Sequence, residues 1–246
     1  MYDFSDKVIV VTGAAQGLGY ATVKRYLKEN ANKVVILDYN EEALKKAQEA
    51  LDPEKEKTIT VSCDVSDNQA VADAFKKIEE KFGSVDILVN NAGITRDSMF
   101  HKMTAAQFDA VLKVSLYGAF NCSQQVIKGM RDKKYGKIVS LASMSGINGN
   151  IGQTNYSAAK AGIVGFTKTL ALENGPKGVN VNAIAPGMIN TDIIKTVPEN
   201  VQEMLKSKIP MGRFGEPDEI ANLIMFLSSD ESSYISGQCI YVTGGY

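Results

Sequence analysis

The feature that most restricts the fold of this chain is a regular alternation between two kinds of segment. Short β-branched and apolar runs recur along the sequence, and most are followed by a longer segment whose apolar residues repeat with helical spacing. We predict strands at Lys7–Thr12, Lys33–Asp38, Thr58–Cys63, Val85–Asn90, Gly136–Leu141, Val179–Ala185 and Cys239–Val242. The clearest helices are expected at Gly17–Asn30, Glu41–Leu51, Asp67–Phe82, Thr104–Lys133, Thr154–Asn174 and Pro217–Ser228. This alternation predicts an α/β fold, a doubly wound parallel sheet with helices on both faces.

Length and local sequence favour a single domain over residues 1–246. A chain of 246 residues is within the size that a doubly covered sheet reaches around one core. No repeat or interdomain linker interrupts it. Thr104 and Gln107 have the spacing of a capping box, and Pro217 suits the first position of a helix.

Composition favours an ordinary globular protein. The net charge of −1, with 22% charged residues, predicts neither a nucleic-acid partner nor an anionic membrane surface. Cys63, Cys122 and Cys239 are far apart, and His101 is the one histidine; we therefore expect no disulfide framework and no metal site. No apolar run is long enough to span a membrane, and Met1–Asp6 does not resemble a signal peptide, so a cytoplasmic location is expected.

A glycine-rich turn joins the first predicted strand to the first predicted helix. It contains Gly13, Gln16, Gly17, Leu18 and Gly19. Glycines permit a tight turn, and the N–H groups at the start of the following helix attract a pyrophosphate. Placed at a strand-to-helix junction, the turn predicts a dinucleotide-binding site.

An acidic residue, Asp38, ends the second predicted strand, nineteen positions after Gly19. A carboxylate there can accept hydrogen bonds from the hydroxyls of the adenosine ribose, and it would repel a 2′-phosphate. The turn has no Arg or Lys to compensate, because Gln16 precedes Gly17. The predicted cofactor is therefore NAD(H).

Tyr156 and Lys160 are four residues apart and hence lie on one face of a helix. An ammonium close to a phenol favours the phenolate and lowers its pKa, which brings tyrosine into the range useful for acid–base catalysis. This spacing is common on helices, so its meaning depends on the motifs around it.

Together these motifs resemble the short-chain dehydrogenase/reductase family, and the resemblance extends over essentially the whole chain. It includes the run Asn90–Gly93 after the fourth predicted strand, and Ser143 thirteen residues before Tyr156. It also includes Pro186–Gly187, with Thr191, after the sixth predicted strand.

The resemblance implies a role for each matching residue. Tyr156 would be the general acid in reduction and the base in oxidation, Lys160 would bind the nicotinamide ribose and tune Tyr156, and Ser143 would hydrogen-bond the substrate oxygen. The remaining cofactor contacts implied are Asp64 and Val65 at the adenine, Asn91 on the adenosine side, Gly93 in the same motif, and Ile189 and Thr191 at the nicotinamide end.

Ser115 departs from the family pattern, in which an asparagine is usual as a fourth catalytic residue. In the family, the main-chain carbonyl of that residue holds a water that joins the lysine to a proton relay. A serine could retain this main-chain contribution, so Ser115 remains a candidate catalytic residue.

Within the family, Gly93–Asp97 and Gly212–Ala221 resemble bacterial 3-oxoacyl-(acyl-carrier-protein) reductases. This implies reduction of a β-keto thioester to the (R)-3-hydroxy product, with the acidic carrier protein docking at Lys134 and Lys177. Two long helices and the last strand would form the contacts of a homotetramer.

Two alternatives remain open, because most of these fatty-acid enzymes use NADPH whereas Asp38 favours NAD(H). One is an NAD-dependent dehydrogenase of another secondary alcohol, such as a sugar alcohol, steroid or hydroxy acid. The other is a non-catalytic NAD-binding protein, for which Ser115 is the one supporting feature.

Overall fold

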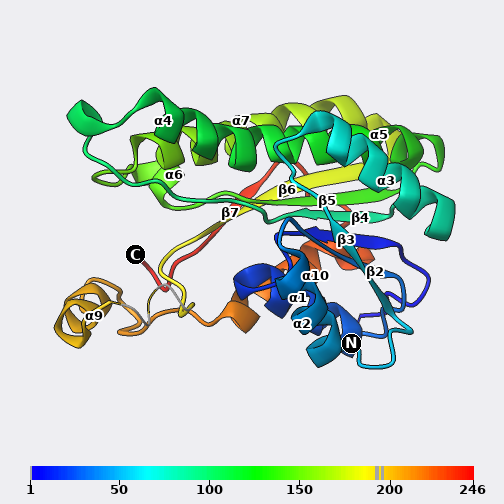
Figure 1. The fold of residues 1–246 in the computed structure, drawn as a ribbon, viewed down its shortest axis with the longest axis horizontal. Helices are drawn as coiled ribbons and strands as arrows, with labels where there is room; N and C mark the ends of the chain where they lie inside the picture. The colour runs from blue at the N-terminus through cyan, green and yellow to red at the C-terminus, as the bar shows by residue number, and fades with distance from the viewer. Residues whose placement is uncertain (1, 192–193, 195–196) are drawn as a thin grey trace.

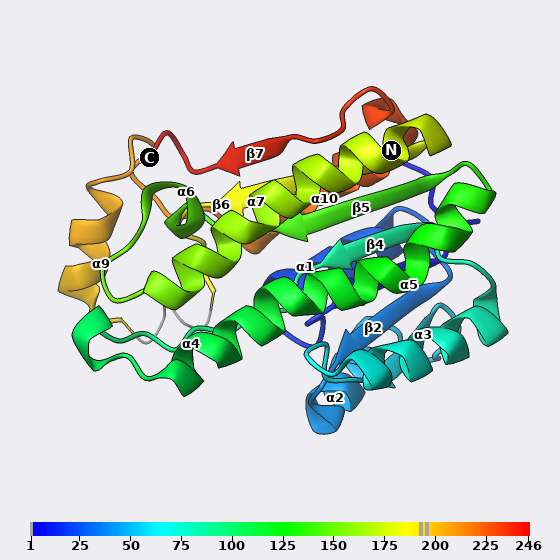
Figure 2. The same cartoon turned by 90° about the horizontal axis from the view of Figure 1, so that it is seen from above.

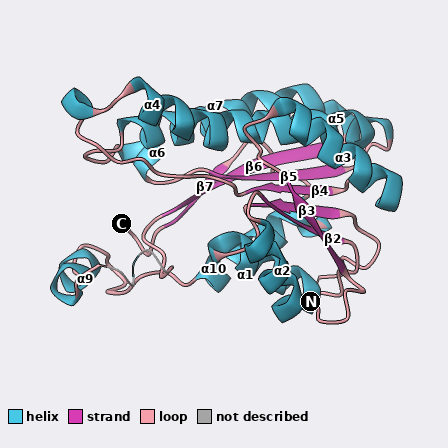
Figure 3. Ribbon diagram, in the orientation of Figure 1, coloured by secondary structure: helices cyan, strands magenta, loops and turns pink. Residues whose placement is uncertain are grey.

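Seven parallel strands form one sheet in the order β3-β2-β1-β4-β5-β6-β7. The structure, a computed structural model, describes residues 2–191, 194 and 197–246. The strands are β1 (Ile9–Thr12), β2 (Val34–Asp38), β3 (Thr58–Ser62), β4 (Ile87–Asn90), β5 (Gly136–Leu141), β6 (Val179–Pro186) and β7 (Cys239–Val242). Every predicted strand is present, and the predicted doubly wound parallel sheet is confirmed (Figure 3).

Helices cover both faces of the sheet (Figure 1). One face carries α1 (Gly17–Lys28), α2 (Glu41–Leu51) and α10 (Pro217–Ser228). The other carries α3 (Asn68–Phe82), α4 (Ala105–Leu112), α5 (Gly118–Asp132) and α7 (Thr154–Asn174). Because both faces are covered, β1, β2, β4 and β5 are buried along their whole length, and most of their residues are apolar.

The long helix predicted at Thr104–Lys133 is divided in the structure. A π-helical turn, Lys113–Tyr117, separates α4 from α5. Its i→i+5 hydrogen bonding inserts one extra residue, a local irregularity that is too short to be recognised from the apolar spacing of the sequence. The predicted capping box of Thr104 and Gln107 is present at the start of α4.

Short helices were missed by the sequence analysis, because four to eight residues carry too little periodicity to be recognised. They are α6 (Ser145–Asn148) and α9 (Glu199–Lys206), with single 3₁₀ turns at Phe100–Lys102, Gly175–Lys177 and Asp230–Ser232. The capping box at the start of α10, formed by Glu216 and Glu219, was also missed, although Pro217 is in the first turn as predicted.

All seven strands point the same way, so their carboxyl ends meet at one edge of the sheet (Figure 2). We call this edge the carboxyl edge. The strand order reverses between β1 and β4, which is the position where open α/β sheets bind ligands. Lys134 and Lys177 precede β5 and β6 and therefore lie at the opposite edge.

Candidate active site

The glycine-rich turn between β1 and α1 has a shape that requires glycine at three positions. Gly13 and Gly17 adopt φ angles of 61° and 59°, in the left-handed region. A Cβ at Gly19 would collide with the carbonyl oxygen of Gly13. Gln16, the N-cap of α1, makes no side-chain capping bond, which leaves the first N–H groups of α1 available to an anion. Leu18 packs against the apolar core beneath the turn.

Asn91 and Thr12 tie this turn to the loop after β4. The Asn91 Nδ2 donates hydrogen bonds to the carbonyl oxygens of Thr12 and Gly13, both at 2.9 Å. The Thr12 Oγ1 accepts from the N–H groups of Asn91 and Ala92, both at 3.0 Å. The amide protons of Asn91 therefore stabilise the turn itself, and its Oδ1 is left for a ligand.

Asp38 lies at the end of β2, beside the turn. Its side chain is buried, and its carboxylate accepts one hydrogen bond on each oxygen, from the N–H groups of Ala15 and Asn40, both at 3.2 Å. Each oxygen keeps a further lone pair, so the carboxylate can also accept from ribose hydroxyls. The turn, the uncapped start of α1 and this carboxylate fit a nicotinamide dinucleotide, with the pyrophosphate at the turn.

Asp64 and Val65 follow β3 at the same edge. The backbone N–H of Cys63 donates to the carbonyl oxygen of Asp38 at 2.9 Å, which places the segment next to Asp38. The Asp64 carboxylate is exposed and accepts from the N–H and hydroxyl of Ser66. Val65 is buried and packs against Gly118 of α5, where a Cβ would collide with it.

Ser143, after β5, and Tyr156, in the first turn of α7, lie close together. The Ser143 Oγ accepts a hydrogen bond from the N–H of Ser145 at 3.2 Å. Burial raises the pKa of Tyr156; hydrogen bonding to the Ser143 hydroxyl lowers this pKa, and the negative charge of Asp97 raises it further. The balance is upward, so the phenol holds its proton at neutral pH and can donate it.

Lys160 is buried one turn along α7, with 4% of its surface exposed. Its Nζ donates to the carbonyl oxygen of Leu141 and lies 5.6 Å from the centre of the Tyr156 ring. Burial lowers the pKa of the Lys160 ammonium to about 8. The expectation that the pKa of Tyr156 lies below its ordinary value is wrong for this structure, because burial is the largest influence on it and raises it.

Ser115 lies in the π-helical turn, directly beside this group. Its side chain is 2% exposed, and its Oγ has no hydrogen-bond partner among the described residues. A Cβ at Gly93 would lie 3.3 Å from the Ser115 Oγ and 3.4 Å from the Lys160 Nζ. Gly93, which has no side chain, therefore lies next to both of these polar atoms.

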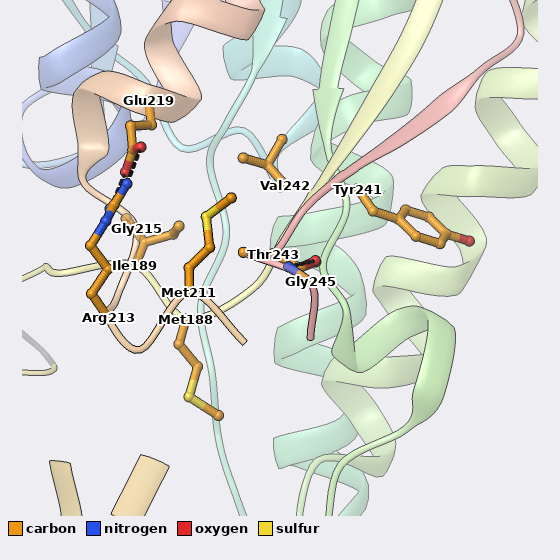
Figure 4. Close-up of a pocket in the computed structure, with 11 residues that line it drawn as sticks. Met188, Ile189, Met211, Arg213, Gly215, Glu219, Tyr241, Val242, Thr243 and Gly245 are labelled. Carbon is orange, nitrogen blue, oxygen red and sulfur yellow. Dashed lines mark hydrogen bonds and ion pairs between the residues drawn. The ribbon is translucent and has the colours of Figure 1, made fainter. Parts of the chain in front are cut away.

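The segment after β6 carries the candidates Ile189 and Thr191. Ile189 is buried and pairs with Gly215, and the N–H of Thr191 donates to the carbonyl oxygen of Ile189 at 2.8 Å. Ile189 lines a cavity of about 310 Å³. Figure 4 shows the residues around this cavity. Its lining comprises Met188, Ile189, Met211, Arg213, Gly215, Glu219, Tyr241, Val242, Thr243, Gly244 and Gly245.

Several residues of this region were missed by the sequence analysis. Arg213 and Glu219 form an ion pair at 2.7 Å on the wall of the cavity. The Arg-x-x-x-x-x-Glu spacing is present in the sequence, but it does not predict an ion pair unless the turn that precedes α10 is known.

Asn155 was also missed by the sequence analysis, although it directly precedes Tyr156.

The part of the chain that the structure describes contains no candidate metal site, disulfide or membrane-spanning helix. No cluster of His, Cys, Asp and Glu there could hold a metal ion, and Cys63, Cys122 and Cys239 are unbonded. None of the helices among these residues is both long and apolar enough to cross a membrane.

Comparison with known proteins agrees with this geometry. A family model described as enoyl-(acyl carrier protein) reductase matches residues 13–246. The chain is 44% identical over 241 residues to 3-oxoacyl-(acyl-carrier-protein) reductase of Thermotoga maritima, with 97% of each chain covered. It is 46% identical over 244 residues to acetoacetyl-CoA reductase of Shinella zoogloeoides, covering 97% of this chain and 98% of that protein. The solved structure of levodione reductase matches with a TM-score of 0.92 at 37% identity, covering 98% of both chains. The chain therefore belongs to the short-chain dehydrogenase/reductase family of nicotinamide-dependent oxidoreductases.

Proposed function

We propose that the protein reduces a 3-oxoacyl thioester to the 3-hydroxyacyl product with NADH. The observation that carries this proposal is the Ser143–Tyr156 pair, in which burial keeps the Tyr156 phenol protonated and thus suited to donate a proton. Two relatives bear names that state reduction of 3-oxoacyl thioesters, at 44% and 46% identity. Both support the substrate class.

The side chains divide the work of carbonyl reduction. Bound NADH supplies the hydride. The Ser143 hydroxyl donates a hydrogen bond to the substrate oxygen and orients it toward Tyr156. The Tyr156 Oη then gives its proton to this oxygen as negative charge develops there.

Lys160 and Ser115 assist Tyr156 when it loses this proton and when it is protonated again. With a pKa of about 8, the Lys160 ammonium is mostly charged at neutral pH and stabilises the phenolate that Tyr156 leaves behind. We propose that the main-chain carbonyl of Ser115 contributes to the return path, as the usual asparagine does in the family.

Tyr156→Phe tests the proposed acid. The substitution removes one oxygen and leaves the aromatic ring, so NADH binding should stay within a few-fold of the wild type. The rate of acetoacetyl thioester reduction should fall by about 10²–10⁴-fold, the usual contribution of general acid catalysis. Steady-state kinetics and a fluorescence titration of NADH binding measure the two effects, and a near-normal rate would remove Tyr156 from the mechanism.

Ser115→Ala separates the side chain of this residue from its backbone. If the carbonyl alone is used, the variant should keep its rate within about threefold, and loss of a buried, unpaired hydroxyl should not lower stability. A rate loss above about tenfold, equal to about 1.4 kcal/mol of barrier, in a protein with unchanged melting temperature would show that the hydroxyl itself participates.

The preference for NADH rests on Asp38. The buried carboxylate lies beside the turn, and the turn itself contains no cation. The 2′-phosphate of NADPH would approach this carboxylate, and like charges about 4 Å apart near a protein surface repel by up to about 4 kcal/mol before relaxation. The ribose hydrogen bonds to Asp38 would be lost as well.

We expect kcat/KM to be at least about tenfold higher with NADH than with NADPH, because one unfavourable contact of about 1.4 kcal/mol is sufficient for this ratio. Replacing Asp38 with Ser and Gln16 with Arg should reverse the preference, since a guanidinium binds a phosphate through two hydrogen bonds. The measurement is kcat/KM for both cofactors with one carbonyl substrate. A wild type that prefers NADPH would contradict the assignment of Asp38 while leaving the hydride chemistry intact.

We also propose that the protein assembles as a homotetramer in which α5 and α7 form one two-fold interface and the last strand, β7, contributes to another. The outer sides of these helices form a groove of about 360 Å³ lined by Phe120, Ser123, Gln124, Ile127, Phe166, Thr169, Leu170 and Glu173. Large apolar side chains are exposed nearby, with Leu172 at 80% and Phe120 at 43%. A second copy, related by a two-fold axis, would cover them.

Such an assembly would allow Lys134 and Lys177 to bind a carrier protein near an active site. The two loops that carry them are in contact, because a Cβ at Gly178 would collide with the Lys134 carbonyl oxygen. Both lie at the edge opposite Tyr156 in the same chain. A two-fold axis across α5 and α7 makes these helices antiparallel and brings the lysines of one copy toward the Tyr156 of the other. We therefore propose that docking acts between copies.

The double variant Lys134→Glu/Lys177→Glu should reduce the rate with an acyl-carrier substrate and leave the rate with the corresponding CoA thioester unchanged, because only the carrier needs the positive surface. Mixed oligomers of this variant with Tyr156→Phe should recover carrier-dependent activity. In them, one copy supplies the docking lysines and its neighbour supplies Tyr156. Equal loss with both substrates would contradict docking at these lysines, and no recovery on mixing would contradict docking between copies.

A further inference from the structure

Two loops at the carboxyl edge are joined by hydrogen bonds on the side of Tyr156. One follows β4 and contains Asp97 and Ser98; the other precedes α7 and contains Gly152 and Gln153. The Ser98 N–H donates to the Gly152 carbonyl oxygen at 2.8 Å, and the Gln153 Nε2 donates to the Asp97 Oδ2 at 2.9 Å. These bonds hold an exposed, charged loop against the start of the catalytic helix.

Asn155 completes this connection from inside the protein. Its side chain is 0% exposed. Its Nδ2 donates to the carbonyl oxygens of Arg96, at 2.9 Å, and Gln107, at 3.2 Å, and its Oδ1 accepts from the N–H of Tyr156 at 2.8 Å. One amide thus joins the loop after β4, helix α4 and the first turn of α7. No side-chain cap from Gln153 fixes that turn otherwise.

The connection determines which charges act on the Tyr156 phenol. The Ser143 hydroxyl, after β5, lowers the pKa of the phenol by hydrogen bonding, and the negative charge of Asp97, bonded to Gln153 at the start of α7, raises it. The Lys160 Nζ, from α7 itself, lies 5.6 Å from the centre of the ring. Asp97 can act on Tyr156 only while its loop is held in place. The bonds of Asn155 and Gln153 hold it there.

We propose that Asn155 is a positioning residue for the reduction and that Asp97 is the group through which part of its effect reaches Tyr156. Asn155 fixes the backbone of Tyr156 and the loop that carries Asp97 relative to each other, and the Asp97 carboxylate then opposes ionisation of the phenol. The proposal rests on the proposed function, because it assumes that Tyr156 transfers a proton. It assigns a role to two side chains that are not members of the Ser143, Tyr156 and Lys160 group.

Asp97→Asn tests the electrostatic part without disturbing the fold, because Asp97 is exposed and an amide oxygen can still accept from Gln153. Removing the negative charge should lower the midpoint of Tyr156 ionisation by about 0.2–0.5 pH unit, as expected for a solvent-screened charge. The midpoint is measured from tyrosinate absorbance as the difference between each protein and its own Tyr156→Phe counterpart. The shift should shrink at high salt. Asp132→Asn, at the opposite edge, is the control and should leave the midpoint unchanged.

Asn155→Ala tests the positioning part. It should lower kcat for thioester reduction by about tenfold or more, as misplacement of a reacting group does, and leave the dissociation constant of NADH unchanged. The control is Asn174→Ala. Asn174 is a buried asparagine near the other end of α7, which donates to the Leu170 carbonyl oxygen and accepts from Arg131. Asn174→Ala should lower the melting temperature about as much as Asn155→Ala does. It should not lower kcat to the same extent.

The outcomes distinguish failure of this inference from failure of the proposed function. A wild type that reduces no thioester contradicts the proposed function, while the tyrosinate titration still reports on Asp97. An unmoved midpoint in Asp97→Asn overturns the role of Asp97. If Asn155→Ala and Asn174→Ala lose kcat equally, or if Asn155→Ala keeps it, Asn155 is only a structural residue.

Discussion

Parallel pairing of the central strands is the constraint on which the site depends. The register aligns Val11 of β1 with Val89 of β4, Asn90 with Ser140 of β5, and Leu141 with Ile184 of β6. With this register, all four strands end at the same edge. The glycine turn, Asn91, Ser143 and the Pro186–Gly187 segment therefore meet there, although they are far apart in the sequence. The helices α4, α5 and α7, packed on one face, then deliver Ser115, Tyr156 and Lys160 to the same place.

Burial is the second determinant of the chemistry. Taking a phenol and an ammonium out of water disfavours the phenolate and the ammonium alike, so the pKa of Tyr156 rises and that of Lys160 falls to about 8. Burial therefore moves the two pKa values apart, with that of Tyr156 above its ordinary value and that of Lys160 below it. Leu141 provides a carbonyl oxygen for Lys160, and Ser143 provides a hydroxyl for Tyr156. A phenol that stays protonated in this setting suits reduction.

Sequence patterns predicted the architecture because strand and helix spacings differ and a parallel sheet requires both faces to be covered. They also singled out Ser143, Tyr156 and Lys160, which the fold brings together. The π-helical turn at Ser115 and the bonds of Asn155 could not be predicted from such patterns. A single inserted residue is too short an irregularity to be recognised in the apolar spacing, and a side chain that bonds to the backbone of Arg96 and Gln107 leaves no pattern of residue types. The direction of the Tyr156 pKa shift was mispredicted because spacing gives proximity but does not give burial.

The central claim is that this site reduces a 3-oxoacyl thioester in preference to other carbonyl chemistry. The most direct test is kcat/KM for NADH-dependent reduction of acetoacetyl-CoA, compared under the same conditions with NAD-dependent oxidation of sugar alcohols, steroids and hydroxy acids. Reduction of the thioester should exceed every alcohol by at least about tenfold, or 1.4 kcal/mol of transition-state stabilisation. An alcohol that is turned over as well as the thioester, or a thioester that is not reduced at all, would contradict the assignment.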